Sequence, residues 1–89
     1  MRFMPVLSKF YGIVIRMLCV RPFAARFHAF YEQSELVVQI SPLRIVAGDA
    51  PARVCDLVLE WAEQHQQELL QAWNRCRIAE KPLPIAPLQ

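Results

Sequence analysis

Apolar residues in the first half of the chain occur in four short runs separated by turn-forming residues. The runs are "IVIRMLCV" directly after Gly12, "ARFHAFY" at 25–31, "LVVQI" at 36–40 and "LRIVAG" at 43–48. Each run is rich in β-branched or aromatic side chains and too short for a helix of this apolarity, which favours four strands. Pro22 ends the first strand, and the polar residues 32–35 predict a hairpin connection. The short links favour an antiparallel meander, because parallel pairing needs a long crossover.

The second half of the chain follows a helical period. Apolar residues recur at three- and four-residue steps and predict one stripe, formed by Val54, Leu57, Val58, Trp61, His65, Leu69, Trp73 and Cys76. We expect Asp49 to cap this helix and Pro51 to occupy its first turn. A helix unbroken from 51 to 79 would be about 43 Å long at 1.5 Å per residue. Because so small a domain is narrower than that, we expect the last turns to project or bend.

These elements predict an α+β fold in a single domain over residues 1–89. A four-stranded antiparallel meander sheet is packed on one face by a long C-terminal helix. The closing "KPLPIAPLQ" contains three prolines and predicts an extended tail that packs Leu83 and Ile85 against the body. A hydrophobic content of 55% with only 2 glycines excludes a disordered chain and indicates few loops.

Alternation along the strands predicts which side chains the helix covers. The uniformly apolar set, which we expect to face the helix, is Ile13, Ile15, Met17, Cys19, Phe27, Ala29, Tyr31, Leu36, Val38, Ile40, Leu43 and Ile45. The complementary set, which we call the open face, is Val14, Arg16, Leu18, Arg26, His28, Phe30, Val37, Gln39, Arg44 and Val46. A merely solvated face would carry Thr, Ser, Lys and Glu. Apolar side chains beside arginine instead indicate a contact surface.

Three kinds of partner suit such a surface. A partner protein would bury the apolar side chains and offer carboxylates to Arg16 and Arg44. Single-stranded RNA would stack a base on Phe30 while arginines bind phosphates. A second copy of the chain is the third possibility.

The charge is small but unevenly distributed. The net charge is +2, yet residues 1–31 carry five basic side chains and no acidic one, whereas the rest carry five basic and eight acidic ones. The basic members of the first part are Arg2, Lys9, Arg16, Arg21 and Arg26. This asymmetry either builds a basic binding surface or is neutralised between the two halves of the fold.

The cysteines indicate thiols rather than a disulfide framework. Cys19, Cys55 and Cys76 are odd in number and form no C-x-x-C motif, so we expect buried thiols in a reducing compartment and no zinc site. No apolar run reaches the eighteen or so residues that cross a bilayer, since Arg16 interrupts the longest run. We therefore expect a cytoplasmic protein that binds no membrane.

Four blocks together resemble a known family. "SKFYGIVIRM", "FHAFY", "GDAPARVCDLVLEWAEQHQQELLQAW" and "PLPIAPL" are similar to the small bacterial proteins of domain-of-unknown-function family 4160, from about Met4 to Leu88. The resemblance implies a small α+β protein, often encoded beside a second small protein of domain-of-unknown-function family 2442, and a place in toxin–antitoxin-like pairs. We expect no cofactor.

One departure from the family matters. Its members usually carry a D-H-x-P-P-H-F-H segment between the first two strands, whereas this chain retains only His28, with Pro22 and Arg26 at the places of the other two histidines. A metal or acid–base site built from three imidazoles is therefore absent. A catalytic role for the family cannot be carried onto this chain.

The candidate binding residues are Arg16, Arg26, His28, Phe30 and Arg44, and no catalytic set emerges. His28 has no acidic residue nearby in sequence, so a structural strand histidine is weighed against a general base or a phosphate contact. We expect His65, Trp61 and Trp73 to belong to the core or its boundary. The acidic exposed half of the helix argues against insertion into a DNA groove.

Two hypotheses follow. In the first, the chain is an interaction component of a toxin–antitoxin-like pair and binds a partner protein through the open face. In the second, it is an RNA-binding or ribonuclease-type toxin that uses Arg16, Arg26 and His28.

Overall fold

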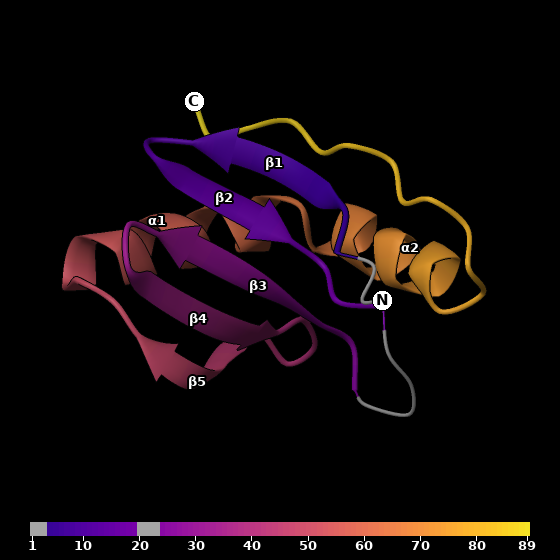
Figure 1. Ribbon diagram of the computed structural model, residues 1–89, viewed down its shortest axis with the longest axis horizontal. Helices are drawn as coiled ribbons and strands as arrows, with labels where there is room; N and C mark the ends of the chain where they lie inside the picture. Colours follow the sequence, from indigo (N-terminus) through magenta and orange to yellow (C-terminus); the bar gives the residue numbers. More distant parts are fainter. Residues whose placement is uncertain (1–3, 20–23) are drawn as a thin grey trace.

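The computed structural model describes residues 4–19 and 24–89. Its strands are β1 (Val6–Phe10), β2 (Ile13–Arg16), β3 (Arg26–Tyr31), β4 (Ser34–Gln39) and β5 (Arg44–Asp49), and its helices are α1 (Ala52–Gln64) and α2 (Gln66–Cys76). The strands form one antiparallel sheet in the order β1-β2-β3-β4-β5, with both helices on one side of it (Figure 1). The α+β class and the antiparallel meander are confirmed.

The sheet has five strands rather than the expected four, because β1 was missed. The β1–β2 hairpin turns at Tyr11 and Gly12, with φ of 50° and 79°. Two successive positive φ angles are the signature of a type I′ turn. Ser8 and Lys9 interrupt the apolar run of β1, and tyrosine is not the usual first residue of such a turn, so neither the strand nor the hairpin has a clear signal in the sequence. The next strand was predicted too long: β2 ends at Arg16, and the proposed stop at Pro22 lies outside the described residues.

The predicted single helix is also wrong, since it is divided at His65. This residue has φ −123° and ψ 24°, which separates α1 from α2. The molecule measures 33 × 24 × 24 Å, so a rod of about 43 Å would have protruded from it. Asp49 does not cap α1: Pro51 holds the N-cap position and no side chain caps the helix.

The core forms where the helical stripe meets the apolar face of the sheet. Trp61 is fully buried, with the rings of Phe10 and Phe27 at 5.4 and 5.7 Å between centroids. The buried sheet residues expected from alternation are Ile13, Ile15, Met17, Phe27, Ala29, Leu36, Val38 and Ile40. Each large aliphatic side chain among them stabilises the fold by about 1.5–3 kcal/mol. The predicted helix-facing set is thereby confirmed for its central members.

The tail after α2 is extended, as expected, and lies beside α2 and β1 (Figure 1). Ile85 donates its backbone N–H to the carbonyl of Leu7 at 2.8 Å, and the indole Nε1 of Trp61 donates to the carbonyl of Ala86 at 2.8 Å. Ile85 is buried as predicted. Leu83, however, is 61% exposed, so its expected packing is wrong. Pro82 and Leu88 are buried instead, and these residues fix the tail to the body.

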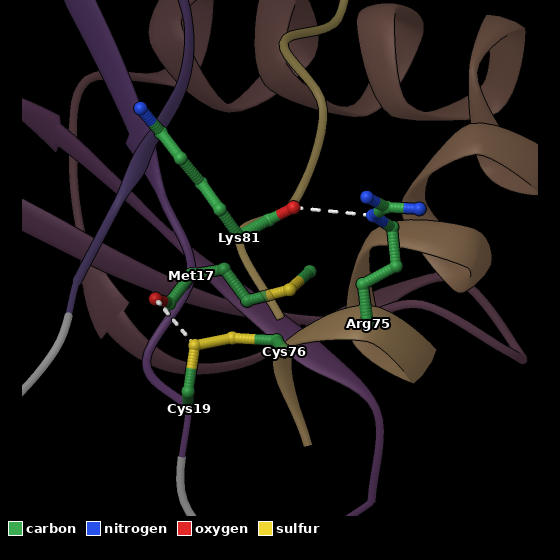
Figure 2. The surroundings of a disulfide bond; sticks show 5 residues. All are labelled: Met17, Cys19, Arg75, Cys76 and Lys81. Carbon is green, nitrogen blue, oxygen red and sulfur yellow. Dashed lines mark hydrogen bonds between the residues drawn. A yellow bond between two sulfur atoms is a disulfide. The ribbon is translucent and has the colours of Figure 1, made fainter. Parts of the chain in front are cut away.

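A disulfide joins Cys19 to Cys76, with the two Cα atoms 5.3 Å apart, so the expectation of three thiols is wrong (Figure 2). Cysteines 57 positions apart show no motif, and only the fold brings the segment after β2 against the end of α2. Cys55 is the free cysteine in the described part of the chain. Because disulfides persist mainly in oxidising compartments, the cysteines of this chain no longer indicate a reducing one. The cytoplasmic location stays a prediction.

Neither α1 nor α2, the helices of the described ranges, is long and apolar enough to cross a membrane.

Candidate interaction face

The strand register places the five candidate residues on the surface of the sheet opposite the helices. Arg16 pairs with His28 across β2 and β3, and Phe30 lies two positions from His28 on the same face. Arg26 pairs with Gln39, which pairs in turn with Arg44. The period of two therefore predicted this grouping correctly.

Two outer members of the predicted open face are not placed by alternation. Leu18 lies beyond the end of β2, and Val46 lies at the register shift between β4 and β5. An irregularity in a strand breaks the period of two, so residues beyond it cannot be assigned to a face by parity.

Apolar side chains occupy the middle of the open face. Val14, Phe30 and Val37 are each half-buried, and Val6, which pairs with Arg16 from the missed strand β1, is exposed. The rings of Phe30 and His28 are stacked, with 6.2 Å between centroids and 13° between planes. Both helices lie on the opposite side of the sheet (Figure 1). The four apolar side chains therefore form a surface on the side that neither helix covers.

His28 has a carboxylate partner that the sequence did not suggest. Its Nδ1 lies 2.8 Å from Oε2 of Glu35. Residues 32–35 were expected to form the connection between strands, but Ser34 and Glu35 belong to β4. Glu35 pairs with Phe30 and so shares its face with His28. Counting back from a two-residue turn at 32–33 is the signal that would have found this partner.

The imidazole of His28 is oriented by this contact. An ionised carboxylate only accepts hydrogen bonds, so Nδ1 carries the proton and donates to Glu35. The residue is 9% exposed, and its buried Nε2 has no hydrogen-bond partner among the residues that the structure describes. Chemically, the pair resembles a carboxylate–histidine dyad in which Nε2 is the basic atom. That atom, however, does not reach the surface.

The charges on this face are mixed. Arg16 donates from Nη1 to the carbonyl of Met4 at 3.0 Å, and Arg44 is exposed. Glu35 pairs with Asp49 across β4 and β5, which brings two carboxylates to the same surface. Carboxylates thus share this face with Arg16 and Arg44, so the face is of mixed charge rather than uniformly basic. Arg2 and Arg21 lie outside the described residues.

No group of three or more His, Cys, Asp or Glu side chains within residues 4–19 and 24–89 is arranged to hold a metal ion. A pocket elsewhere, between α2 and the tail, is lined by Glu68, Gln71, Ala72, Asn74, Arg75, Leu83, Pro84 and Ile85. It contains none of the candidate residues.

Comparison with curated proteins and with solved structures gave no significant match. One family model, described as a domain of unknown function (DUF4160), matches residues 12–74. The match is narrower than the resemblance expected from Met4 to Leu88, because it leaves out β1 and the tail. The matched range includes all five candidate residues. The bacterial origin and the altered histidine segment stay predictions, and positions 21–23 of that segment lie outside the described residues. Since the matched residues span more than half of the sequence, the chain belongs to the DUF4160 family.

Proposed function

We propose that the chain is a protein-binding component of a bacterial toxin–antitoxin-like pair and that it binds its partner through the open face. The observation that carries this proposal is the group of half-buried Val14, Phe30 and Val37 on neighbouring strands, on the side of the sheet that the helices leave uncovered. Apolar side chains framed by charged ones are typical of protein interfaces, whose centre is apolar and whose rim is polar.

The charges indicate the chemistry of the partner. Arg44 is exposed and suits a carboxylate of the partner, whereas Glu35 and Asp49, which face each other on β4 and β5, suit a cation. A partner protein of mixed charge with an apolar centre fits this face better than a uniformly acidic one. The small proteins of domain-of-unknown-function family 2442, which the family resemblance implies as neighbours, are the partners that we propose.

An RNA-directed toxin is the second candidate, and the contact of 2.8 Å between His28 and Glu35 is the observation that favours it. A carboxylate that orients an imidazole is a common arrangement in acid–base catalysis. It ranks second for two reasons. Nε2 of His28 is buried, and Glu35 and Asp49 lie on the surface that would have to bind phosphates.

Co-expression with the small protein encoded in the neighbouring reading frame tests the first candidate. We expect the two proteins to co-purify, and we expect Phe30→Ala to weaken the complex by about tenfold or more, as for an aromatic residue at the centre of an interface. Leu83→Ala is the matched control, because it removes an exposed apolar side chain from the tail. Circular dichroism confirms that both variants fold.

The same experiment separates the candidates. A complex that forms equally well with Phe30→Ala would contradict binding through the open face. If the chain alone inhibits growth or cleaves RNA, and the double variant Arg16→Ala, His28→Ala loses that effect, the second candidate replaces the first.

A further inference from the structure

The two edges of the sheet differ. The outer side of β1 receives the tail through the hydrogen bond from Ile85 to Leu7. In the described chain, β5 is hydrogen-bonded to β4 alone, and it forms the opposite edge of the sheet (Figure 1). An edge strand presents a row of unpaired backbone N–H and C=O groups, which another strand can complete. The free edge of the sheet is therefore β5.

β5 has few of the features that block such pairing. Five of its six residues are exposed, among them Val46 at 40% exposure near the middle of the strand. The strand contains no proline, and its only charged residues are Arg44 at the first position and Asp49 at the last. Proteins usually protect a free edge with prolines, with charges inside the strand or with bulges, and of these β5 has only the irregularity at Val46.

The order of residues in β5, "RIVAGD", is complementary to itself. When two such strands run antiparallel about a point between Val46 and Ala47, Arg44 of each meets Asp49 of the other. Ile45 of each then lies opposite Gly48, whose lack of a side chain leaves room for it. Arg44 pairs with Gln39 and Asp49 with Glu35 on the same face of the sheet, so opposite charges would meet on that face.

Both charged residues lack an ion pair within the described part of the chain. Asp49 instead pairs with the like-charged Glu35 across β4 and β5, which is an unfavourable arrangement. An arginine from a second molecule would relieve this repulsion. The charge pattern therefore indicates which strand completes the edge.

We propose that two copies of the chain associate through their β5 strands, antiparallel and about a two-fold axis, into one continuous sheet. Two symmetric ion pairs, each between Arg44 and Asp49 of the partner subunit, fix the register. The backbone edge of β5 lies beside the open face, and Arg44 and Asp49 stand where the two meet. The dimer is argued from the free edge and its charge pattern and does not rest on the proposed function.

Sedimentation equilibrium of the purified chain, without any partner protein, tests the dimer. We expect a reversible monomer–dimer equilibrium from low micromolar to submillimolar concentration that weakens as salt is added. We expect Arg44→Asp and Asp49→Arg each to weaken self-association by about tenfold or more, because each variant places like charges opposite each other twice. Arg77→Asp, an equal charge change at an exposed position after α2, should leave it unchanged.

Mixing the two charge variants gives the decisive result. One Arg44→Asp chain and one Asp49→Arg chain restore two opposite-charge pairs, so we expect the equimolar mixture to dimerise at concentrations at which either variant alone is mainly monomeric. The double variant Arg44→Asp, Asp49→Arg should also self-associate. A wild-type chain that stays monomeric at submillimolar concentration overturns the proposal, as does a mixture that stays monomeric. A dimer unaffected by Arg44→Asp shows that a different surface is used and overturns it as well.

Discussion

The imidazole of His28 has one satisfied nitrogen and one unsatisfied nitrogen in a buried position. Nδ1 is 2.8 Å from Glu35, while Nε2 lacks a partner among the described residues. A buried polar atom without a hydrogen bond costs free energy. Glu35 therefore stabilises the fold by giving one of the two ring nitrogens of His28 a hydrogen-bond partner. The same contact orients the imidazole ring that stacks on Phe30.

Replacing Glu35 by alanine tests this account. The change leaves both nitrogens of His28 without partners, and we expect the free energy of unfolding to fall by about 1–3 kcal/mol. The substitution also removes the repulsion between Glu35 and Asp49, which offsets about 0.2–1 kcal/mol of this loss. Urea denaturation measures the difference. Gln33→Ala, at an exposed position in the adjacent turn, should change stability by less than about 0.5 kcal/mol. Equal effects of the two substitutions would mean that the His28–Glu35 contact adds nothing.

Alternation along the strands predicted that the five candidate residues share one face, but it did not predict the contact between His28 and Glu35. Alternation needs only the approximate position of a strand to assign its faces, and β2 and β3 were located well enough to group Arg16, His28 and Phe30. Assigning Glu35 to this face would have required the length of the turn between β3 and β4. An error of two residues left it in the connection instead of on β4. A register is set by the turn geometry, which a polar cluster indicates only coarsely.

At the scale of elements, strongly periodic segments were predictable and interrupted ones were not. The four apolar runs correspond to β2–β5, and most of the helical stripe is buried as expected. β1 escaped because Ser8 and Lys9 break its run, although Ser8 is buried in the structure. The break at His65 was not predicted, because His65 stands at a position that continues the apolar stripe of the helix. The molecule, 33 × 24 × 24 Å, is shorter than the unbroken helix would be, but its dimensions are not visible in the sequence.

The tail is the element whose contribution to stability is easiest to test. Ile85 is 5% exposed, and Ile85→Ala should lower the free energy of unfolding by about 2–5 kcal/mol, since it leaves a cavity beside the core. The variant keeps the backbone N–H that bonds Leu7, so the effect reports on side-chain packing. Thermal and urea unfolding measure it. Leu83→Ala, two positions earlier and 61% exposed, is the matched control and should change stability by less than about 0.5 kcal/mol. Similar losses for both would contradict the tail packing described above.

At the scale of the whole molecule, the disulfide connects the two halves of the fold. The loop that it closes contains β3, β4, β5, α1 and α2. Near it, Arg75 donates from Nε to the carbonyl of Lys81 at 3.1 Å, which holds the start of the tail beside the end of α2 (Figure 2). Spacing in the sequence could not reveal this pairing, because it depends on how every element between the two cysteines is arranged.

Reduction should therefore destabilise the molecule without changing its fold. A cross-link across 57 positions restricts the unfolded chain, which in the chain-entropy model stabilises the native state by about 4 kcal/mol. We expect a reducing agent to lower the free energy of unfolding by about that amount, and Cys19→Ser to do the same without it. Cys55→Ser is the control, because Cys55 is a free thiol. Thiol titration of the unfolded protein should show one reactive group before reduction and three after it. Three thiols in the protein as isolated under oxidising conditions, or identical unfolding with and without reductant, would contradict the structural role of this bond.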